Sequence, residues 1–258
     1  MIALTPRNEE LAHALVALDV ERSLELLRQG AEPAKVDAFF LGKGQGGCVS
    51  VLLKAVADAE DQRAFALASA HRNTGEALDI KATLASQAAP QRAAVLGLVK
   101  ALKKVDPELL LENRARGLTP LQEAATLGWG RLVSWMADQG VDLDEANGYG
   151  RTAAHYAALW GHRDTLKRLH TRGVDLNVQD QDQQTPAHLA ATQQHINVMR
   201  SLWHYGADFG LANTKGKTPG ETLGMHDAGL VARWQAWEKT QEALPEQPDQ
   251  GPRRSPRP

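Results

Sequence analysis

The chain has 258 residues, of which 43% are hydrophobic, and a formal net charge of -2. This hydrophobic content favours a folded core over disorder, and the near-neutral charge gives no reason to expect binding to nucleic acid or to an anionic membrane. Cys48 is the single cysteine, so an internal disulfide is excluded and a small buried side chain is expected there.

The N-terminal sequence carries Glu9 and Glu10 where a signal peptide would have an uninterrupted apolar run. No stretch reaches the roughly 18 apolar residues that a membrane-spanning helix needs. We therefore expect a cytoplasmic protein, with export by a leaderless route as the alternative.

The N-terminal half, residues 1–110, is predicted to form irregular helix pairs. We expect the helices of three pairs at residues 8–15 and 20–29, 50–56 and 61–71, and 76–88 and 91–104. Pro90 is predicted to break the chain between the last two helices, because proline interrupts a helix.

Residues 34–49 are too long for a simple turn between helix pairs and contain the Gly-rich segment 39–47. Two readings stay open for this insertion, a flexible loop and an extended finger that touches a partner. A phosphate-binding loop is not expected, because no Gly-x-x-x-x-Gly-Lys-Ser/Thr sequence follows a strand.

The C-terminal half contains an internal repeat with a period of 33 residues, marked by Thr119, Thr152, Thr185 and Thr218. Threonine caps a helix, and the proline that follows it in three of the four units is tolerated in the first helical turn. Gly128 and Gly161 are expected to break the chain between two helices, and Gln194 takes the same position in the third unit. A second block, Gly-Val/Ala-Asp, recurs and predicts a turn after each second helix.

The period and the motif Gly-x-Thr-Pro-Leu-His-x-Ala-Ala resemble the ankyrin repeat, in the form found in leaderless bacterial proteins. This resemblance implies an all-α ankyrin-repeat solenoid of stacked helix–turn–helix units, with about six to seven helix pairs of which the first three are degenerate. We predict degenerate pairs at 1–110 with the insertion at 34–49, regular repeats with a C-terminal cap at 111–244, and a disordered tail at 245–258.

The resemblance also implies a binding surface, because ankyrin arrays contact partners through the inter-repeat turns and the first helices, which line a concave face. By register, the expected contacts are Arg116, Leu118, Leu127, Trp129, Tyr149, Arg151, Leu159, Trp160, Gln181, Asp182, Gln184, Gln193, Lys215 and Lys217. Tyr149, Arg151 and Trp160 are expected as anchors, since these residue types are enriched among binding hot spots. Packing against a neighbouring repeat is the alternative for Trp160, and it is the expected role of Trp135, Trp203 and Trp234.

Catalytic and metal-binding patterns are missing from the sequence. His155 and His188 match the family's first-helix histidine, which makes structural hydrogen bonds between repeats. Neither His-Glu-x-x-His nor Gly-x-Ser-x-Gly occurs, so we expect no cofactor, no metal and no enzymatic activity.

The predicted function is that of a non-catalytic scaffold that binds a protein of unknown identity and is a monomer when free. Neutralising a partner enzyme or toxin, as an immunity protein does, is one specific form of this role. The alternatives are an effector delivered into another cell and an enzyme with a catalytic domain in the N-terminal half.

Overall fold

The computed structural model describes residues 4–34, 36, 48–74, 80–105, 117–224 and 228–242. All regular secondary structure in these residues is helical, which confirms the all-α prediction. The Gly-rich segment 39–47, Arg116 and the tail 245–258 lie outside the described residues, so the predictions made for them stay predictions.

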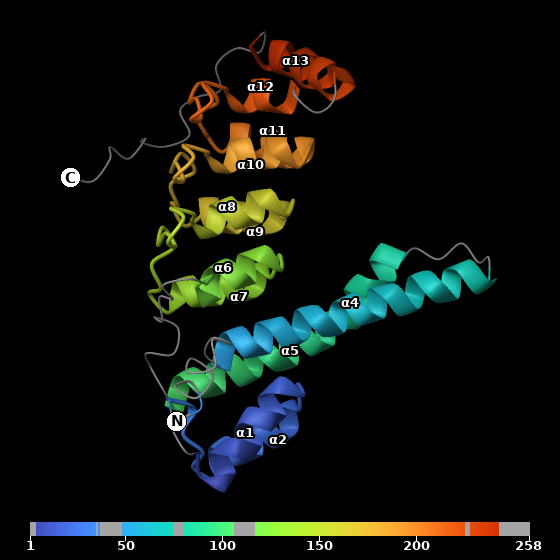
Figure 1. Ribbon diagram of the computed structural model, residues 1–258, viewed down its shortest axis with the longest axis vertical. Helices are drawn as coiled ribbons and strands as arrows, with labels where there is room; N and C mark the ends of the chain where they lie inside the picture. The colour runs from blue at the N-terminus through green and yellow to red at the C-terminus, as the bar shows by residue number, and fades with distance from the viewer. Residues whose placement is uncertain are drawn as a thin grey trace.

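The helices follow one another in antiparallel pairs that stack in a single column (Figure 1). They are α1 (Pro6–Val16), α2 (Val20–Arg28), α4 (Cys48–Thr74), α5 (Ile80–Val105), α6 (Pro120–Thr126), α7 (Gly130–Asp138), α8 (Ala153–Leu159), α9 (Arg163–His170), α10 (Pro186–Thr192), α11 (Ile196–His204), α12 (Pro219–Gly224) and α13 (Ala228–Glu242). The first helix of each pair contacts the first helix of the next, from α1 through α4, α6, α8 and α10 to α12. This row forms one face of the stack, which we call the inner face.

The first helices of the regular units begin as the threonines predict. Thr119 accepts a hydrogen bond from the backbone N–H of Gln122, and the Gln122 side chain accepts one from the backbone N–H of Thr119. Thr152 and Thr185 form the same reciprocal cap with His155 and His188. Such caps satisfy N–H groups that have no partner within the helix, which fixes where each helix starts.

The prediction of a second and a third helix pair is wrong. In place of four short helices, the structure has two long ones, α4 and α5. Helix α4 continues through residues 57–60, where a break was expected, and α5 continues through Pro90. A proline inside a helix costs about 3 kcal/mol. Pro90 lies on an exposed side of α5, while the remainder of α5 packs along α4 and α2 and offsets this cost.

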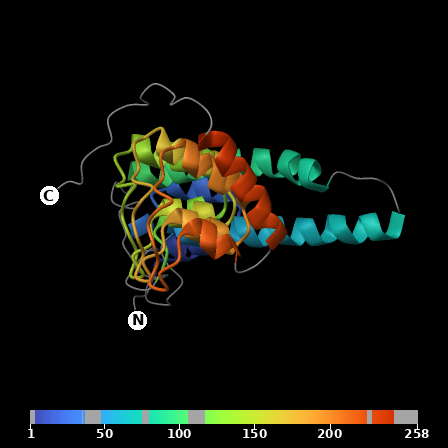
Figure 2. The same cartoon turned by 90° about the horizontal axis from the view of Figure 1, so that it is seen from above.

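The long pair projects beyond the rest of the stack, on the edge opposite the inter-repeat turns (Figures 1 and 2). We call its outer part, residues 57–74 and 80–94, the arm. The inner ends of the two helices are built like an ordinary repeat, with Val49, Leu52 and Leu98 fully buried in the common core. The arm is therefore an extension of one repeat at the place where other repeats have a tight turn.

The tight turns between paired helices need a left-handed residue. Gly128 and Gly161 have φ of 64° and 78°, and Gln194 follows them with φ of 59°. A Cβ on Gly128 would collide with the ring of His162, so glycine is also required there for space. The prediction that Gln194 replaces the inter-helix glycine is confirmed.

We expect Gln194→Gly to raise the free energy of unfolding by about 1 kcal/mol, because a side chain in the left-handed region is strained and glycine is not. Urea unfolding followed by circular dichroism measures the change. Gln193→Gly is the matched control, since Gln193 has φ of -91° and gains nothing from glycine. A Gln194→Gly variant no more stable than the wild type would contradict the strain argument.

The C-terminal end of the stack is closed by an aromatic cluster. Trp234 of α13 is buried and stacks on Phe209, with ring centroids 5.1 Å apart. Trp203 and Trp237 pack around the ring of Trp234, and their ring centroids lie 6.1 and 4.9 Å from its centroid. The expectation that Trp234 is a packing residue is confirmed, and Trp135 and Trp203 pack against the core while half-buried. Cys48 is buried as predicted.

Candidate protein-binding surface

The inter-repeat turns are held rigid by one side chain in each repeat. The Oδ1 atom of Asn147 accepts hydrogen bonds from the backbone N–H groups of Tyr149 and Arg151, at 3.0 and 3.1 Å. Asp180 and Asn213 do the same in the next two repeats. Because two backbone donors are fixed by one acceptor, the backbone at the tips of these turns has a defined conformation.

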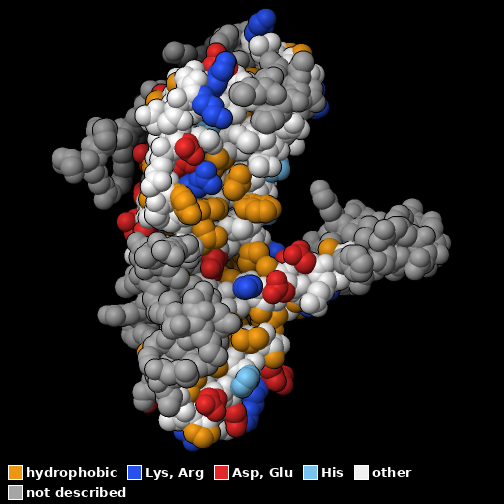
Figure 3. Space-filling view, in the orientation of Figure 1, with side chains coloured by type: hydrophobic (Ala, Val, Ile, Leu, Met, Phe, Trp, Pro, Cys, Tyr) orange, Lys and Arg blue, Asp and Glu red, His pale blue; other side chains and the backbone are white. Residues whose placement is uncertain are grey.

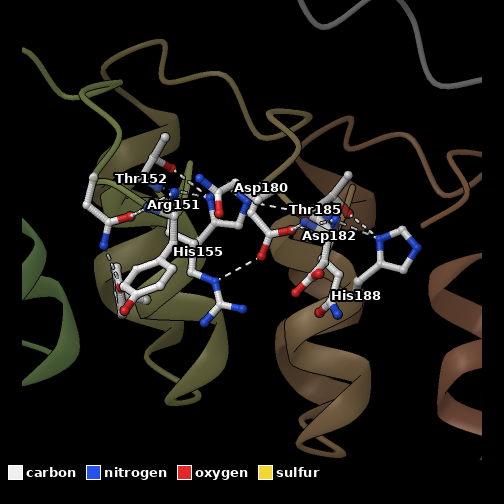
Figure 4. A network of polar contacts seen from close by, with 12 residues as sticks. Arg151, Thr152, His155, Asp180, Asp182, Thr185 and His188 are labelled. Atoms are coloured by element: carbon white, nitrogen blue, oxygen red, sulfur yellow. Dashed lines mark hydrogen bonds and ion pairs between the residues drawn. The ribbon is translucent and has the colours of Figure 1, made fainter. Parts of the chain in front are cut away.

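Histidines join each repeat to the next, as Figure 4 shows. The Nδ1 atom of His155 lies 3.1 Å from the backbone nitrogen of Thr152, and its Nε2 atom lies 3.0 Å from the carbonyl oxygen of Gln184. A backbone N–H can only donate, so Nδ1 is the acceptor and Nε2 carries the proton. His188 bridges in the same way to Lys217, with 2.9 Å between Nε2 and the carbonyl oxygen.

Burial lowers the pKa of His155 to about 4 and also lowers the pKa of His188. Both rings are therefore neutral at neutral pH, which is the form that the two hydrogen bonds require. Gln122 occupies the same position one repeat earlier, where its Nε2 donates to the carbonyl oxygens of Glu145 and Arg151. The side chain at this position forms hydrogen bonds to the next repeat, as the resemblance to ankyrin repeats implied for the histidines.

The Arg151 side chain mainly stabilises the inter-repeat turns. Its Nε atom donates to Asp180 at 2.9 Å, and the two side chains are only 26% and 2% exposed. The pair crosses from one repeat to the next (Figure 4). Arg151 thus stiffens the surface and presents only part of its guanidinium to solvent.

Tyr149 and Trp160 are the aromatic side chains left most open on the described surface, at 63% and 57% exposed. Tyr149 lies in the turn before α8, and Trp160 caps the other end of α8, so together they flank one helix of the inner face. Leu118 and Leu127, which flank α6, and Leu159 at the end of α8 are half-buried. Figure 3 shows hydrophobic side chains on this face of the stack, above the place where the arm leaves it. We call these five residues the inner-face patch.

Comparison with known families identifies the repeat. A family model described as ankyrin repeats (3 copies) matches residues 91–180 and 161–223, just over half of the chain. The chain belongs to the ankyrin-repeat family. Ankyrin repeats are protein–protein interaction modules, and the family is generally non-catalytic. A comparison with curated proteins gives no match.

The ankyrin match begins at Gln91, inside α5. The final part of α5 is thereby aligned with the ankyrin pattern, although the sequence upstream of it is not. This agrees with the arm being an extension within one ankyrin repeat.

For this ankyrin-repeat protein, the prediction that Trp129 contacts a partner is wrong. Its side chain is only 3% exposed, and the guanidinium of Arg92 from α5 lies 5.8 Å from the centre of its ring. The sequence places Trp129 beside the exposed row, but the arm covers it. No local signal could reveal this, because Arg92 is 37 positions away in the chain.

The other predicted residues continue the row of the inner-face patch toward the cap. Exposed side chains are those of Gln181, Asp182, Gln193, Lys215 and Lys217, while that of Gln184 is half-buried. The Gln181 side chain donates to the carbonyl oxygen of Gly148 at 2.7 Å and so also braces the turn. These residues form a polar surface above the apolar one.

Within the described part of the chain, histidine, cysteine, aspartate and glutamate form no group of three or more that could hold a metal ion. The helices described here also include none with the length and apolar character of a membrane span.

Proposed function

We propose that this ankyrin-repeat protein is a non-catalytic scaffold that binds one partner protein through its inner face, with Tyr149 and Trp160 as anchors. The exposure of these two aromatic side chains on a rigid helix row carries the proposal. Burying apolar surface gains roughly 25 cal/mol per Å², so a partner that covers both rings gains appreciable free energy. The backbone of the turn that carries Tyr149 is fixed by Asn147 before binding, which lowers the entropic cost of association.

The remaining residues of the inner face surround these anchors. Leu118, Leu127 and Leu159 complete the apolar centre, and Arg151 holds the turn that carries Tyr149. The polar rim consists of Gln181, Asp182, Gln184, Gln193, Lys215 and Lys217, and Arg116 belongs to it by register. A hydrophobic centre within a polar rim is the usual composition of a specific protein interface.

The N-terminal half supports a scaffold more than a separate catalytic domain. Its described residues, 4–34, 36, 48–74 and 80–105, form two helix pairs that pack into the same stack as the regular repeats. We take the free protein to be a cytoplasmic monomer, and we take binding to neutralise the partner or to recruit it.

The double substitution Tyr149→Ala/Trp160→Ala is expected to lower capture of the partner from native lysate at least tenfold, because hot-spot aromatics contribute roughly 2 kcal/mol or more each. Affinity capture with quantitative mass spectrometry measures this loss. Assaying the captured protein's activity with and without the scaffold then separates neutralisation from recruitment.

Val16→Ala/Val105→Ala is the matched control, because these two side chains are 55% and 50% exposed away from the inner-face patch. Both double variants should melt within about 2 °C of the wild type, since exposed side chains contribute little to stability. Equal capture by the wild type and the Tyr149→Ala/Trp160→Ala variant would refute the assignment of the anchors.

A further inference from the structure

The second helices of the pairs form a row of their own on the other side of the stack from the inner face. Helix α7 packs on α9, and α9 packs on α11. The Nζ atom of Lys103, near the end of α5, donates to Oε1 of Gln139 after α7 at 3.2 Å, so the inner end of α5 continues this row. We call residues 95–105, 130–139, 163–172 and 196–205 the outer row.

The outer row is strongly basic, although the whole chain has a formal net charge of -2. Its acidic residues are Asp138 and Asp164, whereas its basic residues are Lys100, Lys103, Lys104, Arg131, Arg163, Lys167, Arg168, Arg172 and Arg200. Helices α2 and α13, at the two ends of the row, each carry two acidic and two basic residues and do not cancel this excess.

The opposite charge lies on the inter-repeat turns, residues 141–152, 174–185 and 207–218. Their basic residues are Arg151, Lys215 and Lys217, and their acidic residues are Asp142, Asp144, Glu145, Asp175, Asp180, Asp182 and Asp208. The regular repeats therefore separate charge by position, with negative turns and positive second helices. Composition alone hides this separation, because the two excesses nearly cancel over the chain.

Both acidic side chains of the outer row already pair within it. Asp164 accepts a hydrogen bond from Nε of Arg168 at 2.9 Å, and Asp138 lies 3.0 Å from Nη1 of Arg172. Five further cations are exposed, and none of them forms an ion pair with another residue that the structure describes: Lys100, Lys104, Arg131, Arg163 and Lys167. Their charge is available to an anionic ligand.

The surroundings of these cations favour an acidic protein over other polyanions. Single-stranded nucleic acid is usually held by aromatic side chains that stack on bases, and a membrane surface by apolar side chains that insert into it. The large hydrophobic side chains exposed among the described residues are Val16, Val105, Tyr149 and Trp160, and Val105 is the one that lies on the outer row. Ankyrin repeats are protein–protein interaction modules, which also favours a protein ligand.

The spacing of the helices suits an extended chain. Packed helices lie about 8–10 Å apart, so successive helices of the outer row present cations at about that interval. In a polyproline II segment every third side chain points the same way, about 9 Å further along. We infer that the outer row is a second protein-binding surface, which takes an extended acidic segment of a partner protein. This goes beyond the proposed function, because the surface uses the second helices and neither Tyr149 nor Trp160.

The probe is a fluorescein-labelled peptide of about 18 residues in which Glu-Pro-Ala repeats, since proline favours the extended conformation. Its counterpart carries glutamine at every glutamate position. Fluorescence anisotropy with the full chain at about 50 mM salt should show at least tenfold tighter binding of the glutamate peptide. The difference should shrink at about 150 mM salt, because exposed charges are screened. Equal binding of the two peptides, or no binding of either, would overturn the inference.

Charge reversal tests where the peptide binds. Arg163→Glu/Lys167→Glu should weaken binding of the glutamate peptide at least tenfold. Arg7→Glu/Lys54→Glu is the matched control, because it makes the same change in net charge at exposed residues of α1 and α4, in the row of first helices. The control should change binding less than threefold, and thermal melting followed by circular dichroism checks that both variants are folded. Equal effects of the two reversals would mean that net charge, and not the outer row, attracts the peptide.

Other occupants of the outer row give different results. Tighter binding of an oligothymidylate of about seven nucleotides, whose charge is similar to that of the peptide, would assign the row to nucleic acid. Vesicles with about 30% phosphatidylserine that bind the wild type but not Arg163→Glu/Lys167→Glu would assign it to a membrane. Self-association that this variant abolishes, measured by sedimentation velocity, would assign the row to the acidic turns of a second copy. Each of these three results would overturn the inference, whereas partner capture through Tyr149 and Trp160 is tested separately and can fail or succeed on its own.

Discussion

Replacing Trp234 with alanine should destabilise the C-terminal end of the stack by about 3–5 kcal/mol, the usual cost of removing a large buried aromatic side chain. The ring is buried among Phe209, Trp203 and Trp237, so its loss leaves a cavity in the cluster that closes the stack. A repeat array needs its terminal unit to cover the apolar face of the preceding one. The effect should therefore extend to α10 and α11.

Urea unfolding followed by tryptophan fluorescence and by circular dichroism measures this loss. Trp160→Ala is the matched control, because it removes the same side chain type from an exposed position. The control should unfold with the wild type, while Trp234→Ala should show an earlier transition. Coincident curves for the two variants would mean that the aromatic cluster does not hold the cap.

Acid should destabilise the protein through its buried histidines. The ordinary pKa of histidine is about 6.5, whereas burial lowers that of His155 to about 4 in the folded protein. Between these values the unfolded chain binds a proton that the folded protein does not, so the free energy of unfolding falls as the pH decreases. At about 1.4 kcal/mol per pKa unit, His155 alone accounts for a loss on the order of 3 kcal/mol by pH 4. His188, whose pKa is also lowered by burial, adds to this loss.

The structural reason is the direction of the hydrogen bonds. A proton on Nδ1 of His155 would face the backbone N–H of Thr152, which also donates. Gln122 shows that an amide makes the equivalent bonds without titrating. His155→Gln/His188→Gln is therefore the test variant, with urea unfolding measured from pH 7 to pH 4.

The double variant should lose much less stability over this range than the wild type. The free energy of unfolding of the variant should still fall somewhat with decreasing pH, since burial also lowers the pKa of His162. An unchanged slope would show that the two bridging histidines do not cause the acid sensitivity.

The regular part of the fold was predictable because its signals are local. Each repeat has a capping threonine, a left-handed residue between its helices and a turn after its second helix. Each of these signals acts within a few residues, and their recurrence every 33 positions strengthens the prediction. The same register placed Tyr149 and Trp160 on one face without any coordinates. The replacement of the inter-helix glycine by Gln194 was also predictable, since the repeat requires the same backbone conformation there.

The sequence by itself thus determined the repeat, the family and the row of side chains that we propose as the binding surface. Only the tertiary structure decided that α4 and α5 run on as an arm, that Trp129 lies beneath Arg92, and that Arg151 is held by Asp180. Each of these depends on a contact between residues about 30 or more positions apart. Packing between distant segments overrides local preference, as the continuous helix through Pro90 shows, and no motif within one repeat encodes it.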